Sequence, residues 1–305
     1  MMSLMSKLLK STLIASLALS ATLSADDMDG VKLFQTKQST KKREKKLQVP
    51  PTKQLVKYIK RAIVKNPEVR VNGVTVLEAT THKELKGWTV LLTTMDLTFK
   101  KKEIHAPEMM FVKDGLITNN LVNLKTGREY RNEIKPSVPK SMYNDAHLLF
   151  GNKDAAHKVL IFSDPECPFC RETVPDIFKA AKAHPETLAV YYYHLPLLRI
   201  HPVSDVLTKI MHIAQEEGRL DIVEKMYTLK ISPREKNVAK ILKAVKKQTG
   251  YSVTKKQVEA KSVQEAIDED IKMSGKMMVA GTPTIYIDGK WDKMRNGYKK
   301  FIKQK

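Results

Sequence analysis

The chain contains only two cysteines, which lie two residues apart in the run Cys167-Pro168-Phe169-Cys170. A disulfide that closes so short a loop removes little entropy from the unfolded chain, so it would add little stability. Two neighbouring thiols can instead be oxidised to a disulfide and reduced again by exchange with the thiols of another protein. The spacing therefore favours a redox-active pair, with an inert short-loop disulfide as an alternative.

Half of a metal site is the second alternative for the cysteine pair. Zinc and copper sites need further cysteine or histidine ligands at matched spacing, and the chain has no third cysteine. The histidines nearest in sequence, His157 and His184, show no pairing pattern with the cysteines. We therefore predict no metal and no bound cofactor, because the Cys167–Cys170 disulfide is itself the redox group.

The pair is predicted to lie where a buried strand ends and a helix begins. Residues 157–163 form an apolar run, and residues 172–183 have the spacing of an amphipathic helix. The N–H groups and partial positive charge of a helix N-terminus stabilise a thiolate, which lowers the thiol pKa from ~8.5. We expect Cys167 to be the nucleophile and Cys170, which lies one turn further along and deeper, to resolve the mixed disulfide.

Two charged neighbours are predicted to adjust the pKa of Cys167. A carboxylate at Glu166 would raise that pKa if it pointed toward the thiol, because it would oppose the charge of the thiolate. Arg171 would offset this effect. Pro168 suits the first turn of a helix, where its missing N–H costs no hydrogen bond. The sequence leaves open how oxidising the pair is.

The first 25 residues have the pattern of a secretory signal peptide. Lys7 and Lys10 precede an apolar run from Leu13 to Leu23, and the small pair Ser24-Ala25 offers a cleavage point. The run is shorter than the ~20 residues that a transmembrane helix needs. We therefore expect export with removal of residues 1–25, and retention as an uncleaved anchor is the alternative.

Four segments are predicted after the signal peptide. Residues 26–51 form a basic, polar arm, and residues 52–128 combine one helix with antiparallel strands in a small α+β domain. Residues 129–152 are predicted as a linker with a helix near its end. Residues 153–305 alternate strands and helices, which predicts an α/β domain, with a helical insertion at about 202–276.

The chain is strongly basic, with 54 Lys and Arg residues against 33 Asp and Glu residues and a formal net charge of +21. Such a charge could attract nucleic acid or anionic lipid. No aromatic residues interleave the basic stretches in the manner of a nucleic-acid-binding motif. We therefore interpret the charge as a soluble basic surface and expect no nucleic-acid partner.

Two motifs give residues 153–305 a resemblance to the thioredoxin-fold Dsb proteins. One is Phe162-Ser-Asp-Pro-Glu-Cys-Pro-Phe-Cys170, and the other is Gly281-Thr-Pro-Thr284 before the last predicted strand. In that fold a cis-proline loop faces the cysteine pair, and Pro283 matches it. The resemblance implies that Thr282 and Pro283, together with Pro168 and Phe169, contact the substrate, with the backbone at Thr282 pairing with the substrate chain like an added strand.

The order of segments resembles the DsbC/DsbG branch of these proteins. The resemblance implies a small α+β (cystatin-like) dimerisation domain and a helical linker before a thioredoxin-like redox domain. It also implies a periplasmic homodimer and a membrane redox partner, either a DsbD-like reductant or a DsbB-like oxidant. The chain departs from relatives in two respects: DsbC has a second, structural disulfide, and Ile161 stands where thioredoxin has a buried acid.

The predicted activity is thiol–disulfide exchange on unfolded or misoxidised secreted proteins. An isomerase of the DsbC/DsbG type is slightly favoured, because Thr282 before Pro283 is similar to that branch, whereas DsbA has valine there. A dimeric oxidase with a DsbA-like role is the first alternative. A holdase chaperone for secreted proteins is an alternative from another functional class.

Overall fold

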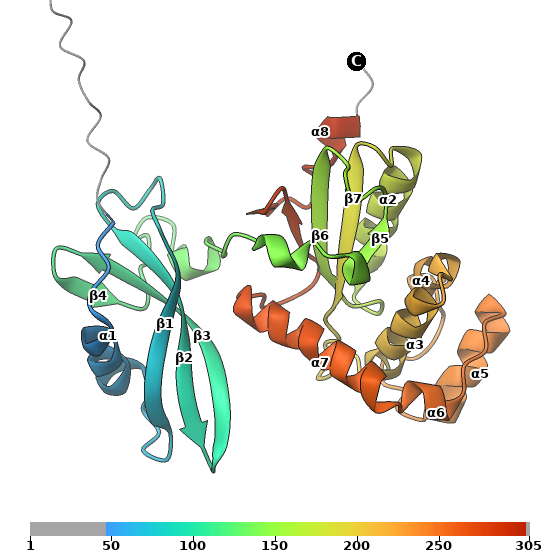
Figure 1. Cartoon of the computed structure of the whole chain (residues 1–305), viewed down its shortest axis with the longest axis horizontal. Coiled ribbons are helices and arrows are strands. Elements are labelled where there is room, and N and C mark those ends of the chain that lie inside the picture. The colour runs from blue at the N-terminus through green and yellow to red at the C-terminus, as the bar shows by residue number, and fades with distance from the viewer. Residues whose placement is uncertain (1–46, 303–305) are drawn as a thin grey trace, which may run out of the picture. The chain divides into compact units, whose positions relative to one another are not determined.

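The computed structural model of the chain describes residues 47–302. The predicted signal peptide and residues 26–46 of the predicted arm lie outside the described residues. The described part contains two β-sheets, one of four strands and one of five (Figure 1). No helix between residues 47 and 302 is long and apolar enough to cross a membrane.

The four-stranded sheet follows a single helix in the chain, as predicted. Helix α1 (Thr52–Tyr58) continues as one π-helical turn, η1 (Ile59–Ile63). The four strands pair antiparallel in the order in which they occur: β1 (Arg70–Thr80), β2 (Thr89–Phe99), β3 (Lys102–Lys113) and β4 (Leu116–Thr118).

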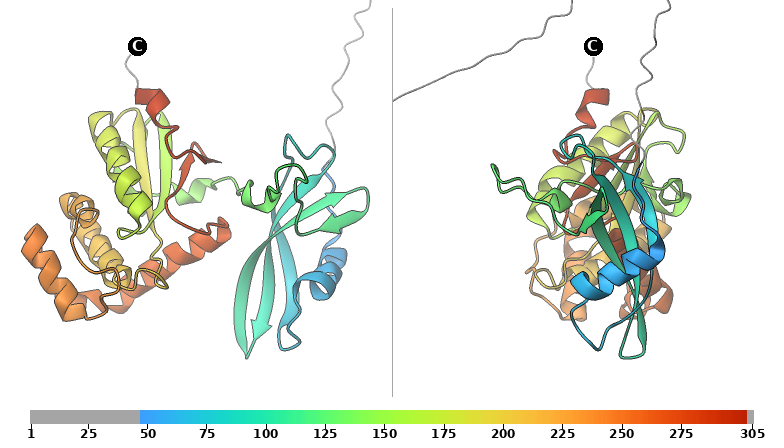
Figure 2. Two further views of the ribbon diagram at one scale, coloured as in Figure 1. Left: turned by 180° about the vertical axis from the view of Figure 1, so that it is seen from behind. Right: turned by 90° about the vertical axis from the view of Figure 1, so that its left-hand side faces the viewer.

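Both faces of this sheet are buried near its centre, because successive residues of a strand point to opposite sides. Leu91 of β2 belongs to one apolar cluster with Leu55 of α1 and Ile59 of η1, and α1 lies against one face of the sheet (Figure 2). Leu92 belongs to a second cluster, which includes Tyr130. The double burial explains why the first five residues of β2, Thr89–Thr93, are all buried instead of alternately buried and exposed.

The helical linker predicted for residues 129–152 is not formed. The segment contains three separate 3₁₀ turns, followed by a short strand: η2 (Tyr130–Asn132), η3 (Lys140–Met142), η4 (Asp145–His147) and β5 (Leu148–Phe150). A helix of about ten residues is marginal in isolation. The apolar residues at its predicted end instead pair with a strand of the five-stranded sheet, where Leu148 opposes Tyr191.

The five-stranded sheet has the order β5-β7-β6-β8-β9. Its central strands are β6 (His157–Ser163) and β7 (Leu188–His194), which run parallel and are both almost completely buried. Strand β8 (Thr284–Ile287) pairs antiparallel with β6, and β9 (Lys290–Trp291) completes the edge. The antiparallel pairing places the beginning of β8 beside the end of β6, where the cysteine motif starts.

Helix α2 (Pro168–Ala183) connects β6 to β7 and lies along one face of the sheet (Figures 1 and 2). The predicted helical insertion consists of five helices: α3 (Ser204–Glu216), α4 (Leu220–Met226), α5 (Val238–Thr249), α6 (Lys255–Val258) and α7 (Lys261–Lys276). A last short helix, α8 (Lys299–Ile302), ends the described chain. Strands, helices and insertion together give the α/β fold predicted for this part of the chain.

Candidate active site

Cys167 occupies the N-cap position of α2. Its backbone is extended (φ −66°, ψ 122°), and its carbonyl oxygen accepts hydrogen bonds from the N–H groups of Cys170 at 2.9 Å and Arg171 at 3.0 Å. Pro168 is the first helical residue, where no backbone N–H is needed. The helix therefore begins before the predicted Glu172, and the thiol lies at its N-terminus as predicted.

Cys167 is 4 % exposed, and in its protonated form the thiol donates a hydrogen bond to the carbonyl oxygen of Thr282 at 3.3 Å. Its pKa is lowered to about 5, mainly by a hydrogen bond from the side chain of Cys170. Thr282 and the backbone N–H groups of Phe169 and Cys170 lower it further, whereas burial opposes the shift. Cys167 is therefore a thiolate at neutral pH.

Cys170 is completely buried, and burial raises the pKa of its thiol well above the usual value. The hydrogen bond to Cys167 and the charge of the Cys167 thiolate raise it further. One cysteine is thus ionised and close to the surface, while the other stays protonated underneath it. This asymmetry is what the predicted roles of nucleophile and resolving cysteine require.

The loop before β8 faces the cysteine motif from the neighbouring strand. The Thr282–Pro283 peptide bond is cis, in agreement with the resemblance. A hydrogen bond within the loop stabilises it: the Thr284 hydroxyl donates to the carbonyl oxygen of Gly281 at 2.7 Å. Thr282 is nearly buried, and its carbonyl oxygen points at the Cys167 sulfur.

Glu166 and Arg171 form an ion pair beside the cysteines. Arg171 also donates to the carbonyl oxygens of Pro165 at 2.8 Å and Leu229 at 2.9 Å. Burial raises the pKa of Glu166 to about 7, although the positive charge of Arg171 lowers it. The largest influences on the Cys167 pKa come from elsewhere, so the predicted modulation of Cys167 by this pair stays a prediction.

Sequence reasoning missed Asp164, which organises the turn between β6 and Cys167. The buried carboxylate accepts hydrogen bonds from the N–H groups of Glu166 and Leu197, both at 2.8 Å. It also accepts from the Ser204 hydroxyl at 2.6 Å and from Nδ1 of His201 at 3.0 Å. The local signal was an acid followed by proline at the end of an apolar strand, but three of its partners lie more than thirty residues away.

The surface next to the cysteines is partly apolar. Phe169 is 59 % exposed, and the Arg295 guanidinium lies 5.7 Å from the centre of its ring. Met294 is 74 % exposed. A surface hollow of about 330 Å³ is lined by these residues and by acidic residues of α2: Phe169, Met294, Arg295, Glu172 and Asp176. The predicted contact residue Phe169 thus lies at an open surface, and its contact with a substrate stays a prediction.

Among residues 47–302, no group of three or more histidine, cysteine or acidic side chains is arranged to hold a metal ion. Thiol–disulfide exchange requires only the two sulfur atoms and a partner thiol or disulfide, so the chemistry of this site needs no bound cofactor.

The thioredoxin family profile matches residues 143–304, which is just over half of the chain. Among solved structures, oxidised BdbD from Bacillus subtilis shares 17 % identity over 54 % of this chain and 92 % of its own, with a TM-score of 0.44. A periplasmic thioredoxin-like protein from Salmonella enterica serovar Typhimurium shares 18 % identity over 54 % of this chain and 98 % of its own, with a TM-score of 0.43. A thioredoxin-like oxidoreductase from Silicibacter pomeroyi DSS-3 shares 21 % identity over 51 % and 88 %, with a TM-score of 0.41. No curated protein sequence matches the chain.

Proposed function

The chain belongs to the thioredoxin family, and on this premise we propose that it is a thiol–disulfide oxidoreductase that acts on exported proteins through Cys167 and Cys170. One observation carries the proposal. The Cys167 sulfur lies at the N-terminus of α2, 3.3 Å from the carbonyl oxygen that precedes cis-Pro283. This position supplies a stabilised thiolate and, directly beside it, the Thr282 backbone that the resemblance assigns to pairing with a substrate chain.

The reaction begins with attack of the Cys167 thiolate on a substrate disulfide. The substrate S–S bond breaks, a mixed disulfide forms with Cys167, and the released substrate sulfur takes up a proton. Cys170 then loses its proton and attacks Cys167, which forms the Cys167–Cys170 disulfide and frees the second substrate thiol. The same steps in reverse transfer the disulfide to a reduced substrate.

The low pKa of Cys167 bears on the direction of the reaction. Stabilising the thiolate stabilises the reduced form of the pair, which makes its disulfide more oxidising. A strongly reducing role is therefore disfavoured. Between the two remaining roles, we place a disulfide isomerase of the DsbC/DsbG type slightly ahead of an oxidase, because of Thr282 before Pro283 and the order of the segments.

The proposal includes the setting in which the protein works. The pattern of residues 1–25 supports export to the periplasm, where thiols are oxidised and wrong disulfides arise. We propose a homodimer formed through residues 52–128. We also propose a membrane partner that reduces or oxidises the cysteine pair after each reaction cycle. Sedimentation of the mature chain tests the first point, since a monomer at micromolar concentration would contradict it.

Insulin reduction and the reactivation of a scrambled disulfide protein test the activity itself. Wild-type protein should accelerate both reactions, and Cys167→Ser should abolish both. A holdase would keep its full effect on aggregation in Cys167→Ser and show no catalysis in the wild type. Reactivation of scrambled protein by the wild type separates an isomerase from an oxidase, which acts only on reduced substrate.

A further inference from the structure

Cys170 must lose a proton in a place that bulk water does not reach. Its side chain is completely buried beneath Cys167. In the mixed disulfide, the substrate covers the sulfur of Cys167 as well, so the direct path to solvent is closed. Ile161, which stands where thioredoxin has an acid, is also completely buried and carries no group that accepts a proton. Another path must remove the proton.

A line of buried hydroxyl groups starts at Ser163, the last residue of β6. Burial raises the pKa of the Cys170 thiol, and the side chain of Ser163 partly offsets this effect, which places Ser163 next to Cys170. The Ser163 hydroxyl is 2.7 Å from the hydroxyl of Tyr227, which in turn is 2.7 Å from the hydroxyl of Tyr192. All three residues are almost completely buried. The hydroxyls therefore form a continuous hydrogen-bonded path through the core.

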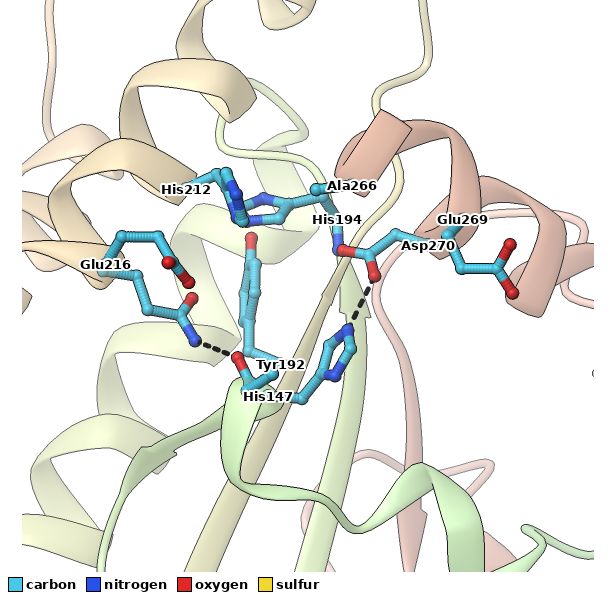
Figure 3. A pocket seen from close by; sticks show the side chains of 10 residues that line it. His147, Tyr192, His194, His212, Glu216, Ala266, Glu269 and Asp270 are labelled. Carbon is cyan, nitrogen blue, oxygen red and sulfur yellow. Dashed lines mark hydrogen bonds and ion pairs between the residues drawn. The ribbon is translucent and has the colours of Figure 1, made fainter. Parts of the chain in front are cut away.

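The path ends at a pocket of about 210 Å³ that Tyr192 helps to line. Figure 3 shows Tyr192 directed toward the rings of His194 and His212. The rings of Tyr192 and His194 lie 4.9 Å apart, centre to centre. Glu216 and Glu269 line the same pocket and are exposed, so the pocket opens to solvent. Its volume is far larger than a single water molecule needs.

His194 indicates that this pocket holds water. The residue is buried, and neither of its ring nitrogens has a hydrogen-bond partner among the described residues. Burial lowers its pKa to about 4, although Asp270 raises it, and His212 and His147 lower it further. A neutral imidazole has one donor and one acceptor, and leaving both unpaired would be costly. A water molecule has the donor and acceptor groups that the two ring nitrogens require.

We propose that Ser163, Tyr227 and Tyr192 form a relay that carries the proton of Cys170 to water in the His194 pocket. The inference rests on the proposed function and adds the route by which the buried thiol is ionised. It also gives the pocket, whose lining includes no residue of the cysteine motif, a role as the proton exit.

The atoms balance along this path. As the Cys170 sulfur attacks Cys167, its proton passes to Ser163, whose own proton passes to Tyr227; the Tyr227 proton passes to Tyr192, and the Tyr192 proton to water. The Cys167–substrate S–S bond breaks, the Cys167–Cys170 bond forms, and the substrate leaves as a thiolate. Because burial raises the pKa of both tyrosines, no phenolate accumulates and the transfers are concerted.

The test removes single hydroxyls without changing the shape of the core. Tyr227→Phe and Tyr192→Phe interrupt the path, and Tyr193→Phe is the matched control. Tyr193 is the next residue of β7, points to its opposite face, and donates its own buried hydroxyl to Met142 at 2.9 Å. Thermal unfolding of all three variants checks that each has folded.

Stopped-flow single turnovers separate the two chemical steps. In both path variants, attack by Cys167 should keep the wild-type rate, whereas resolution of the mixed disulfide should slow about tenfold or more. The solvent deuterium isotope effect on resolution should also change in both, and Tyr193→Phe should match the wild type. Equal resolution rates in Tyr227→Phe, Tyr192→Phe and Tyr193→Phe would overturn the relay. Failure of the wild type in the first step would instead overturn the proposed function.

Discussion

The Cys167 sulfur lies 3.3 Å from the carbonyl oxygen of Thr282, a residue 115 positions further along the chain. The contact arises because β8 pairs antiparallel with β6, so that the start of one strand meets the end of the other. It joins the nucleophile to the backbone that a substrate would pair with. Under the proposed function, attack and substrate pairing therefore take place at one point of the fold.

The reduced protein should contain a thiolate that titrates near pH 5. The hydrogen bond from Cys170 is the largest cause of the lowered pKa, so Cys170→Ala should raise the pKa of Cys167 toward its ordinary value of ~8.5. Thiolate absorbance at 240 nm measures both values. A wild-type pKa near 8.5 would contradict the described geometry of the pair.

The pH dependence of stability should differ between the reduced and oxidised forms. The folded pKa of Cys167 is depressed, so its contribution to the stability of the reduced form is present above the unfolded pKa and is lost as the pH falls toward 5. The reduced form should therefore gain stability relative to the oxidised form between about pH 5 and 8. Urea unfolding of both forms at several pH values tests this, and a constant difference would refute it.

Glu166 should lower the free energy of unfolding of the oxidised protein as the pH rises. Burial raises its folded pKa to about 7, above the unfolded value of about 4.5. The folded state therefore resists ionisation of this group, and stability falls as the pH rises from about 4.5 to 7. Glu166→Gln should remove this dependence. Using the oxidised protein keeps the thiols from titrating, and an unchanged pH profile in Glu166→Gln would contradict the assignment.

Asp164→Ala should lower the free energy of unfolding by about 3 kcal/mol or more, because it leaves several buried donors without an acceptor. Asp268→Ala is the matched control. Asp268 lies on α7, and its exposed side chain accepts a hydrogen bond from the Gln264 amide at 2.8 Å, so its loss should cost under about 1 kcal/mol. Equal losses in urea unfolding would show that Asp164 does not organise the turn.

Phe169→Ser should impair the reaction with protein substrates but leave the small-molecule chemistry intact. The exposed ring offers apolar contact to a polypeptide, whereas a dithiol reagent needs only the sulfur atoms. We expect a several-fold rise in KM for insulin and an unchanged rate with dithiothreitol. Leu124→Ser is the control. It removes an apolar side chain that is 99 % exposed and lies in the segment between β4 and η2. An equal effect of both substitutions would argue against a binding role for Phe169.

The parts of the site predicted correctly are those encoded in short motifs. The position of Cys167 at a helix start follows from the strand-to-helix pattern around it, and the cis peptide before Pro283 follows from the resemblance. The hydrogen bonds of Asp164 and the line from Ser163 to Tyr192 join residues that only the fold brings together. A single sequence carries no signal for such contacts.

For the linker, residues 129–152, the sequence predicted a helix that the structure does not form. The sequence from residue 140 to 149 is compatible with a helix, and local propensity alone favours one. Strand β7 offers an unpaired edge to the same residues, and pairing buries Leu149 and Phe150 in the core as well as satisfying backbone groups. Tertiary contacts therefore outweigh a weak local preference, which is why a prediction from periodicity failed here.

The central claim is that Cys167 exchanges disulfides with protein substrates and that Cys170 resolves the product. Cys170→Ser should stop the reaction after the first step, so that a covalent adduct with a disulfide-bonded substrate accumulates. Mass spectrometry of the non-reduced adduct, after digestion, measures this directly. The account predicts a peptide containing Cys167 linked to a substrate cysteine and released by dithiothreitol. The absence of any Cys167-linked substrate from folded Cys170→Ser protein would contradict it.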